Sequence, residues 1–369
     1  MIYMGIVKSE SADLFNIRIS DFFEMAKTGR AGKLSPGRIA EAILFLRKQT
    51  SRRAVAQKRG LVVPPLLIAS LTRRCNLNCA GCYSRALRPS LPGETSQELS
   101  DDRFMALFEE AVELGVSSIF LAGGEPLLRR ELVERAAKLK GIFLPLFTNG
   151  TLIDDAIVDL AACASIVPIL SIEGEERQTD GRRGPGIHAG ALRWMKEMKS
   201  RKIIFGASLT ITSQNADIAL DAGFLEALAE LGISVLFMVE YVPVSQGTEN
   251  LILSDEQRDR LNQPEQFSRL SFPVVVLPGD EQAYGGCLAA GRGFLHLSPE
   301  GRVEACPFAP FSDMSAADHS FEETLSSPML AAIRERHSEL TETKGGCALW
   351  NKGGWIASLS VCSGARAKS

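Results

Sequence analysis

Short, nearly continuous apolar runs alternate with amphipathic stretches through the middle of the chain. Runs of this kind are typical of strands buried on both faces, and the stretches between them favour helices. The predicted strands are residues 66–71, 118–122, 142–147, 166–172, 203–211 and 234–241. Among the helices, residues 101–114 have Ser100 to cap the start and Gly115 to end it. Six strand–helix repeats are too few for a closed eight-stranded barrel. We therefore expect an α/β fold with a partial (βα)6 TIM-type barrel over residues 65–245.

The two ends of the chain lack this alternation. Residues 1–64 are predicted to form a helical extension on the barrel, with Ser35 as the cap of a helix that begins at Pro36. Its expected apolar face is Ile39, Ile43, Leu44 and Leu46, and its expected solvated flank is Arg52, Arg53, Lys58 and Arg59. A membrane-surface helix is the alternative for this basic flank. Residues 246–369 open with a capping box of Ser254 and Gln257 and are predicted to form a small C-terminal cysteine-rich domain.

Composition narrows the class of protein. The 41 basic and 44 acidic side chains leave a formal net charge of −3, which gives no indication of nucleic-acid binding. No apolar run reaches the roughly 18 residues of a transmembrane segment, and the start of the chain lacks a signal-peptide pattern. We therefore expect a cytoplasmic protein. Because thiols stay reduced in the cytosol, its eight cysteines are predicted to be metal ligands or spare thiols rather than disulfides.

The first group of cysteines follows the first predicted strand. Cys75, Cys79 and Cys82 are spaced as CxxxCxxC, and Tyr83 comes directly after them. Three thiolates on one short loop can hold three irons of a [4Fe–4S] cluster, which leaves the fourth iron open for another ligand. A zinc site with a distant fourth ligand, or unbound thiols, are the alternatives.

This loop resembles the signature of the radical S-adenosylmethionine (SAM) superfamily, in which CxxxCxxC is followed by an aromatic residue. The resemblance continues at the end of the second predicted strand, where Gly123, Gly124, Glu125 and Pro126 match the family's GGEP motif. In the family the backbone and the glutamate of this motif receive the amino group of SAM. Bare glycines allow a close approach of the backbone, and a carboxylate suits an ammonium group.

Further matches follow the third and fourth predicted strands. Thr148 and Asn149 resemble the family's TNG segment, and Ser171 with Glu173 stands where many relatives carry SLDG. The resemblance implies that these side chains contact the ribose or the methionine of SAM, although Glu173 departs from the usual aspartate. Arg183 lies in a stretch similar to HDxxRG, and its guanidinium is the candidate to pair with the SAM carboxylate. A solvated loop is the competing interpretation for that arginine.

The second group of cysteines lies in the last quarter of the chain, at Cys287, Cys306, Cys347 and Cys362. Residues 293–305 are predicted to form a β-hairpin that brings Cys306 beside Cys287. The pattern resembles the auxiliary-cluster region called SPASM or, in its shorter form, twitch, and four cysteines favour the shorter form. The resemblance implies a second [4Fe–4S] cluster. Four thiolates also suit zinc, and unbound thiols are a third possibility.

The remaining candidates have weaker patterns. Cys163 lies in an apolar helical stretch and is expected to be a buried, structural residue. The four histidines form no cluster with ligand spacing, so solvated or hydrogen-bonded histidines are expected. Tyr241, at the end of the sixth predicted strand, is either a substrate-facing residue or an ordinary strand-end aromatic.

The resemblance implies a function. A radical SAM enzyme reductively cleaves SAM at its cluster to a 5′-deoxyadenosyl radical, which abstracts hydrogen from a substrate; the protein supplies positioning and excludes water. Many relatives with SPASM or twitch regions act on peptides or proteins, so that substrate class is expected here, with a flavodoxin- or ferredoxin-type electron donor. The alternatives are the same chemistry on a small molecule such as a sugar, a tetrapyrrole or a lipid precursor, and an iron–sulfur electron carrier or redox sensor that never cleaves SAM.

Overall fold

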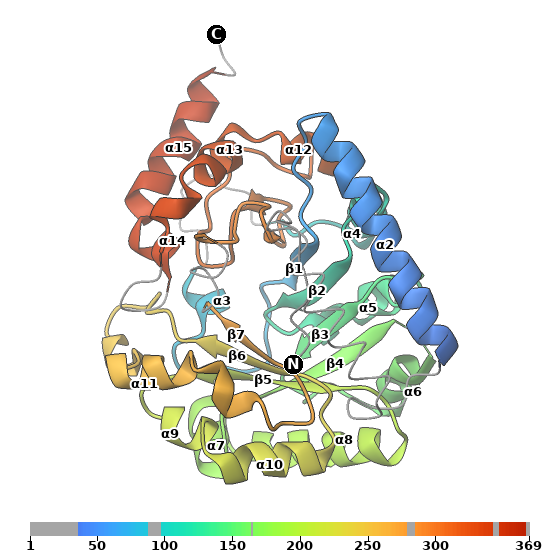
Figure 1. Cartoon of the computed structure of the whole chain (residues 1–369), viewed down its shortest axis with the longest axis vertical. Helices are drawn as coiled ribbons and strands as arrows, with labels where there is room; N and C mark the ends of the chain where they lie inside the picture. Colours follow the sequence, from blue (N-terminus) through green and yellow to red (C-terminus); the bar gives the residue numbers. More distant parts are fainter. Residues whose placement is uncertain (1–35, 88–96, 164, 279–284, 342–346, 367–369) are drawn as a thin grey trace.

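A curled parallel sheet forms the centre of the molecule, and its helices lie on the outer side (Figure 1). The computed structural model describes residues 36–87, 97–163, 165–278, 285–341 and 347–366. All six predicted strands are present, as β1 Leu66–Thr72, β2 Ser118–Gly123, β3 Leu144–Thr148, β4 Ile166–Ile172, β5 Gly206–Ile211 and β6 Leu236–Glu240. Neighbouring members of this series pair in parallel. The carboxyl ends of these strands therefore meet at one edge, as in a partial TIM barrel.

The sheet is wider than the six strands expected from the sequence. β7 Val274–Leu277 pairs in parallel with β6, and β8 Phe294–Leu297 pairs in parallel with β1. The order of the described strands is β7-β6-β5-β4-β3-β2-β1-β8-β9. The predicted hairpin is confirmed, because β9 Val303–Glu304 runs antiparallel to β8. Segments of the predicted cysteine-rich region thus extend the barrel sheet on both sides.

Most of the helices between the strands bury apolar residues in the core, α3 and α7 excepted. The helices between the strands are α3 Tyr83–Ala86, α4 Asp101–Leu114, η1 Pro126–Arg129, α5 Arg130–Ala136, α6 Asp155–Cys163, α7 Glu176–Arg183, α8 Ile187–Ser200, α9 Ala216–Ala219 and α10 Ala222–Leu231. α4 has the predicted ends: the Ser100 hydroxyl accepts a hydrogen bond from the Arg103 N–H, and Gly115 with φ 122° ends the helix. Phe104 and Phe108 of α4 are fully buried in the main core.

The N-terminal helix α2, Pro36–Lys58, runs along the outside of the barrel beside α4 (Figure 1). Ser35, its expected cap, lies outside the described residues. Two expectations for α2 are wrong: Leu44 is 64% exposed, and Arg53 is buried rather than solvated. The Arg53 guanidinium donates to the carbonyl oxygen of Gly115 at 2.5 Å, where the end of α4 leaves carbonyl groups without helical partners.

The C-terminal helices gather at one end of the molecule, past β1 (Figure 1). The described helices after β6 are η2 Glu249–Leu251, α11 Asp255–Leu261, η3 Pro264–Phe267, α12 Phe321–Leu325, α13 Pro328–Glu335, η4 His337–Glu339, α14 Ala348–Asn351 and α15 Gly353–Arg366. The capping box of Ser254 and Gln257 at the start of α11 is confirmed. None of the helices in the described part of the chain is long and apolar enough to cross a membrane.

Candidate active site

The three closely spaced cysteines lie on the loop between β1 and α3, at the carboxyl edge of the sheet. The loop turns sharply at Gly81, whose φ of +66° favours glycine. A Cβ atom at Gly81 would lie 2.7 Å from the hydroxyl oxygen of Tyr241. Tyr241 is buried and lines the same cavity as this loop, so it is more than an ordinary strand-end aromatic.

A cavity of about 830 Å³ opens beside the loop. Cys75, Cys79 and Cys82 all line it, with Cys75 exposed and the other two half-buried. Burial raises the pKa of the Cys75 and Cys79 thiols, whereas the guanidinium groups of Arg183 and Arg182 oppose this rise at Cys79. Three thiols facing one roomy cavity fit an open [4Fe–4S] cluster, because three irons are held and space is left in front of the fourth.

The two glycines of the GGEP segment bring β2 close to the start of the cysteine loop. A Cβ atom at Gly123 would lie 2.6 Å from the Thr72 carbonyl oxygen, and one at Gly124 would collide with the Arg74 carbonyl oxygen. The Gly124 N–H donates to the Thr72 carbonyl oxygen at 2.7 Å, which ties β2 to the chain just before Cys75. Both glycines line the cavity.

The Glu125 carboxylate is buried behind the cavity wall, with 1% of the residue exposed. It accepts hydrogen bonds from the Thr148 hydroxyl at 2.8 Å, from the Asn149 N–H at 2.8 Å and from the Leu127 N–H at 3.1 Å. Burial raises the pKa of Glu125, and these hydrogen bonds oppose the rise. Glu125 therefore fixes the end of β3, and its expected contact with SAM stays a prediction. Pro126 is buried at the start of η1.

Of the two residues expected from the TNG segment, only Asn149 lines the cavity. Its side-chain amide donates to the Asn76 side-chain oxygen at 2.9 Å, inside the cysteine loop. Thr148 is buried on Glu125. Ser171, at the end of β4, also lines the cavity. Asn149 and Ser171 thus line the cavity, as Tyr83 does, and their expected contacts with SAM stay predictions.

Glu173 forms a buried ion-pair cluster with two arginines of α7. The Arg183 Nε donates to Glu173 Oε1 at 2.8 Å, and Arg182 pairs with the same oxygen. The Thr210 N–H donates to Glu173 Oε2 at 3.1 Å. Glu173 itself does not line the cavity, whereas both arginines do. Here the expected partner of the SAM carboxylate, Arg183, already pairs with Glu173, a carboxylate that it shares with Arg182.

Arg182 is the functional residue that the sequence prediction missed. Its Nε donates to the Ala80 carbonyl oxygen at 3.1 Å, and its carbonyl oxygen accepts from the Ala80 N–H at 3.2 Å. Ala80 lies directly after Cys79, so α7 holds the cysteine loop in place. The signal was available as the pair Arg182-Arg183, of which the family motif marks one member.

Three cysteines of the second group reach the cavity from the opposite side. Cys287, Cys306 and Cys347 come from three different segments, are all buried, and all line the cavity. The Cys347 sulfur accepts from the Trp350 N–H at 3.4 Å at the start of α14. Cys362 falls on α15, but its side chain lies outside those described. The described thiols suit a second, more enclosed iron–sulfur site.

An aromatic contact joins the two groups of cysteines. The rings of Tyr83 and Phe308 pack edge to face with centroids 5.2 Å apart. Tyr83 follows Cys82, and the Phe308 N–H lies 3.5 Å from the Cys306 sulfur. Tyr83 thus connects the first cysteine loop to the segment that carries Cys306, and its role beside the cofactor stays a prediction.

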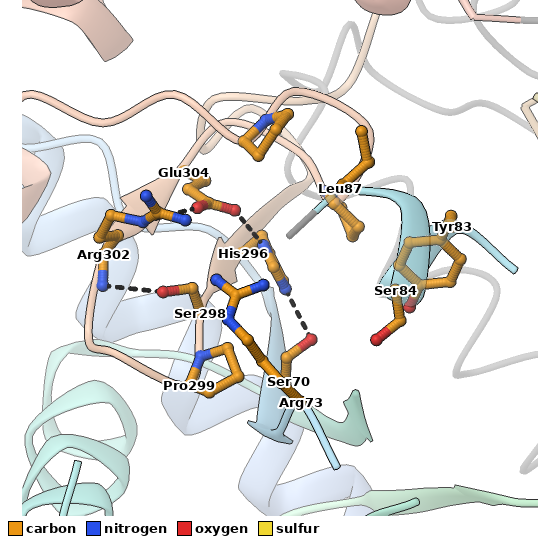
Figure 2. Close-up of a pocket in the computed structure, with 12 residues that line it drawn as sticks. Ser70, Arg73, Tyr83, Ser84, Leu87, His296, Ser298, Pro299, Arg302 and Glu304 are labelled. Carbon is orange, nitrogen blue, oxygen red and sulfur yellow. Dashed lines mark hydrogen bonds and ion pairs between the residues drawn. The ribbon is translucent and has the colours of Figure 1, made fainter. Parts of the chain in front are cut away.

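A buried polar chain lies beside this aromatic pair (Figure 2). His296 Nε2 is 2.8 Å from the Ser70 hydroxyl oxygen, and His296 Nδ1 is 2.7 Å from Glu304 Oε2. Arg302 Nε lies 3.3 Å from Glu304 Oε1. His296 is thus a hydrogen-bonded histidine, as expected, and it joins β1 to β8 and β9. A cavity of about 30 Å³ beside these residues is large enough for a single water.

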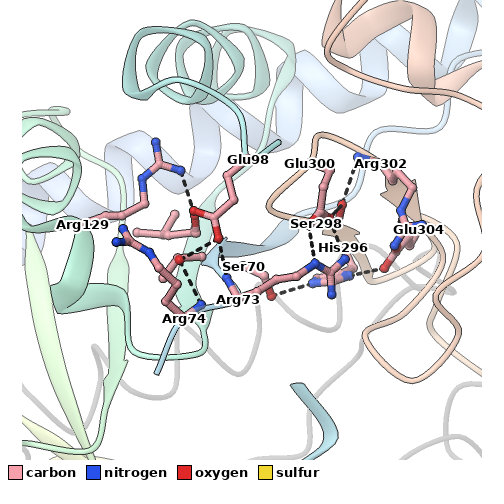
Figure 3. Close-up of polar contacts among 12 residues, drawn as sticks. Ser70, Arg73, Arg74, Glu98, Arg129, His296, Ser298, Glu300, Arg302 and Glu304 are labelled. Carbon is pink, nitrogen blue, oxygen red and sulfur yellow. Dashed lines mark hydrogen bonds and ion pairs between the residues drawn. The ribbon is translucent and has the colours of Figure 1, made fainter. Parts of the chain in front are cut away.

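A second set of polar contacts ties the same elements together (Figure 3). The Arg73 guanidinium pairs with Glu300, with Nη2 2.6 Å from Oε2, while the Arg73 N–H donates to Glu98 at 2.8 Å. The Ser298 hydroxyl donates to Glu300 at 3.1 Å. Because Arg73 lies two residues before Cys75, these contacts link the first cysteine loop to the β8–β9 turn.

Comparisons with known proteins identify the family. Residues 69–212 match the family described as Radical SAM superfamily. The "PqqA peptide cyclase" of Granulibacter bethesdensis is 34% identical over 265 residues, which are 66% of this chain and 68% of that protein. The chain belongs to the radical SAM superfamily. The resemblance seen in the cysteine loop and the GGEP segment is thereby confirmed.

Other relatives of this radical SAM enzyme agree. The "AdoMet-dependent heme synthase" of Methanosarcina barkeri is 26% identical and covers 83% of this chain and 92% of its own. Streptococcus suis SuiB has been solved bound to precursor peptide SuiA, with a TM-score of 0.59 and 18% identity, covering 94% of this chain and 88% of its own. SuiB bound to S-adenosylmethionine gives a TM-score of 0.62, with 16% identity over the same shares. These structures confirm the partial-barrel fold.

As a member of this superfamily, the radical SAM enzyme uses a [4Fe–4S] cluster and SAM as cofactors. The alternative of an electron carrier or redox sensor is set aside, since the named relatives are enzymes. Cys163, which lies outside the site, also differs from its prediction, because it is exposed rather than buried. It lies on the last turn of α6, where its thiol donates to the Asp159 carbonyl oxygen at 3.2 Å.

Proposed function

We propose that this radical SAM enzyme abstracts hydrogen from an uncharged side chain of a peptide or protein. The observation that carries the proposal is the lining of the 830 Å³ cavity. Most of it is apolar strand surface, such as Phe120 of β2, Phe147 of β3 and Phe237 of β6, whose rings pack together. Such a surface favours an apolar group beside the polar site for SAM.

Charge in the cavity is scarce and already paired. Among the described lining residues, Arg182, Arg183 and Glu240 are the charged ones apart from cysteines. Both arginines pair with Glu173, and Glu240 accepts from the Arg258 Nε at 2.9 Å. The two arginines share one carboxylate, and in this proposal the SAM carboxylate takes Arg183. A substrate carboxylate would then lose its hydration without a further cation among the described lining residues, which is costly. Thiolate ligands at both cysteine sites add negative charge and increase that cost.

A tetrapyrrole precursor is the second candidate, because relatives named heme synthase and Fe-coproporphyrin III synthase match this chain. Tetrapyrrole precursors carry several carboxylates, which binding sites usually pair with arginine, lysine or histidine. The charges that line this cavity do not offer that pattern. The relatives whose names include a peptide are the PqqA peptide cyclases and SuiB, solved with its precursor peptide. The lining disfavours a tetrapyrrole but suits a peptide side chain and a lipid precursor alike, and the peptide relatives favour the peptide class between these two.

The chain's own residues have distinct roles in the proposal. Cys75, Cys79 and Cys82 hold the cluster, while Gly123, Gly124, Asn149 and Ser171 border the place for SAM. When bound, the cluster and SAM supply a 5′-deoxyadenosyl radical that abstracts hydrogen. Arg183 pairs with the SAM carboxylate by exchanging its contact with Glu173, and Arg182 keeps the cysteine loop in position. The apolar walls exclude water from the radical.

The second group of cysteines completes the proposal. Cys287, Cys306 and Cys347, with Cys362 as a fourth ligand, hold an auxiliary [4Fe–4S] cluster. Their burial supports a closed cluster, and a zinc ion is the alternative for four thiolates. A flavodoxin- or ferredoxin-type protein supplies the electron. Iron and zinc analysis of the reconstituted protein distinguishes the two metals.

Deuterium transfer tests the substrate class. The reconstituted, reduced enzyme is incubated with SAM and with peptides from a protein digest of cells grown in D2O, or with deuterated coproporphyrin. We expect 5′-deoxyadenosine to gain deuterium from the peptides and none from the porphyrin. Deuterium from the porphyrin alone would replace the peptide proposal by the tetrapyrrole one. If no 5′-deoxyadenosine forms at all, the proposed chemistry itself fails.

A further inference from the structure

Strand β7 ends the sheet on the side away from the second group of cysteines. It pairs with β6, and in the described part of the chain no strand follows it in the order of the sheet. An end strand leaves every second backbone N–H and C=O group without a partner from the sheet. β7 therefore presents backbone groups that a further strand would satisfy.

The cavity of the active site reaches this free edge. All four residues of β7 line the cavity, although successive side chains of a strand point to opposite faces. The cavity therefore extends along the whole of this end strand. The four residues are partly or fully exposed, and Leu277 is 36% exposed. The edge of β7 thus belongs to the wall of the active site.

The pairing pattern identifies the outward-facing groups. The Leu236 N–H of β6 donates to the Pro273 carbonyl oxygen at 3.0 Å, and Leu236 is the register partner of Val274. In a parallel pair this arrangement turns the N–H and C=O of Val274 away from β6, and the same holds for Val276 two residues later. Within the described part of the chain, no backbone group from outside the sheet pairs with these outward groups.

The edge has few of the features that usually block pairing. The strand is short and is bounded by Pro273 and Pro278, but inside it reads Val-Val-Val-Leu, with no charged residue, proline or bulge. Natural edge strands are commonly protected by charges, prolines or bulges, because an apolar edge invites another strand. The adjoining lining is also apolar, with Phe237 and Val239 of β6 beside β7. The edge is therefore suited to an extended chain with uncharged side chains.

We propose that the free edge of β7 binds the peptide substrate as an added strand. The backbone of the peptide pairs with the N–H and C=O groups of Val274 and Val276, and one of its uncharged side chains reaches into the cavity toward the first cysteine loop. Strand addition gives affinity through the main chain, and the apolar pocket selects the side chain. This inference rests on the proposed function, because it assumes a peptide substrate.

Amide hydrogen exchange of the reconstituted enzyme tests the edge directly. Without peptide, the amides of Val274 and Val276 exchange faster than those of Val275 and Leu277, which face β6. The probe is a pool of N-acetylated, C-amidated octapeptides without charged residues. We expect the pool to slow exchange at Val274 and Val276 by about tenfold or more, since each added hydrogen bond protects its own amide. A matched pool with alternating aspartates gives no such protection.

A pair of variants supplies the control. Val276→Pro removes the outward N–H and leaves the ladder to β6 intact, whereas Val276→Ala removes side-chain atoms and keeps the N–H. We expect the peptide pool to bind Val276→Pro about tenfold more weakly than Val276→Ala. Circular dichroism and thermal unfolding establish that both variants fold.

Three results would overturn the inference: exchange that the peptide pool leaves unchanged, equal affinity of the two variants, or amides of Val274 and Val276 that are protected before peptide is added. The last result would show that another segment or a second copy covers the edge. Formation of 5′-deoxyadenosine is measured in the same preparations. Its loss alongside normal edge protection would contradict the proposed function and leave the edge inference standing.

Discussion

The two groups of cysteines border one cavity but differ in their exposure to solvent. Cys75 is exposed and Cys79 and Cys82 are half-buried, whereas Cys287, Cys306 and Cys347 are 9%, 7% and 8% exposed. The first group lies on one short loop at the open edge of the sheet. The second group comes from three segments that the packing of the C-terminal elements brings to the cavity wall.

The charges near the two groups differ as well. Arg182 and Arg183 oppose the rise of the Cys79 pKa, and they line the cavity next to the first loop. Near the second group, the guanidinium of Arg292 donates hydrogen bonds to backbone oxygens, with Nη1 2.6 Å from the Cys287 carbonyl oxygen. These differences indicate that the first group of cysteines suits a charged ligand such as SAM. The burial of the second group suits a site that excludes solvent.

Thiol alkylation of the cluster-free protein gives the largest expected contrast between the two groups. We expect iodoacetamide to modify Cys75 on the order of 100-fold faster than Cys306, because a buried thiol reacts only after local opening. Exposed Cys163 serves as an internal reference. Mass spectrometry of peptides over time measures the rates, and similar rates at Cys75 and Cys306 would remove the contrast.

The next largest effect is expected at Arg182, which supports the first cysteine loop. Arg182→Lys loses the forked contact that joins Ala80 to Glu173, so the cysteine loop is less well positioned. We expect the affinity for SAM to fall by about 10- to 100-fold. Arg177→Lys on the same helix is the control, since Arg177 is exposed. Equal SAM affinity in the two variants, measured by calorimetry on the reconstituted protein, would refute the role of Arg182.

His296 joins β1, which leads to the first group of cysteines, to β8 and β9, which lead to Cys306 of the second group. His296→Ala leaves Glu304 and Ser70 buried without this partner, and we expect a loss of about 2–4 kcal/mol in the free energy of unfolding. His319→Ala removes an exposed histidine and is expected to cost under about 0.5 kcal/mol. Urea denaturation measures both values. A neutral His296→Ala would show that the buried chain does not stabilise the fold.

The smallest effect is expected away from both sites, at the Asp154–Arg130 pair. Hydrogen bonds from Arg130 lower the pKa of Asp154 to about 2. The folded pKa lies below the ordinary value of about 3.8, so the pair stabilises the fold above that pH and loses its effect as pH falls toward 2. Because half of the Asp154 side chain is exposed, we expect Asp154→Asn to cost under about 1 kcal/mol at pH 7. The difference from wild type should vanish in denaturation curves near pH 2.

The sequence predicted the parts of the fold that depend on local pattern. The six buried strands, the ends of α4 and the hairpin before Cys306 each follow from apolar runs, caps or turn residues within a few positions. β7 and β8 were not predicted as members of the sheet. Each has four residues and no periodic context, and its place in the sheet is decided by long-range pairing with β6 or β1.

The sequence likewise predicted some features of the candidate site and missed others. Motif spacing placed Cys75, Cys79 and Cys82 on one loop, and all three line the cavity, while their role as cluster ligands stays a prediction. Spacing alone did not show that the carboxylates of Glu125 and Glu173 are buried outside the cavity and accept hydrogen bonds from the protein itself. That arrangement depends on which neighbours donate to them. Cys163 was misjudged because an apolar helical stretch does not reveal which face of the helix meets solvent.

Two triple variants test whether the first group of cysteines binds the cluster that cleaves SAM and the second group binds a separate cluster. Iron content and SAM cleavage are measured in both. One variant replaces Cys75, Cys79 and Cys82 by serine, and the other replaces Cys287, Cys306 and Cys347. After anaerobic reconstitution and reduction, we predict that the second variant still binds SAM and forms 5′-deoxyadenosine, whereas the first retains iron but does neither. The account is contradicted if the first variant cleaves SAM, or if the second variant holds its cluster and fails to bind SAM.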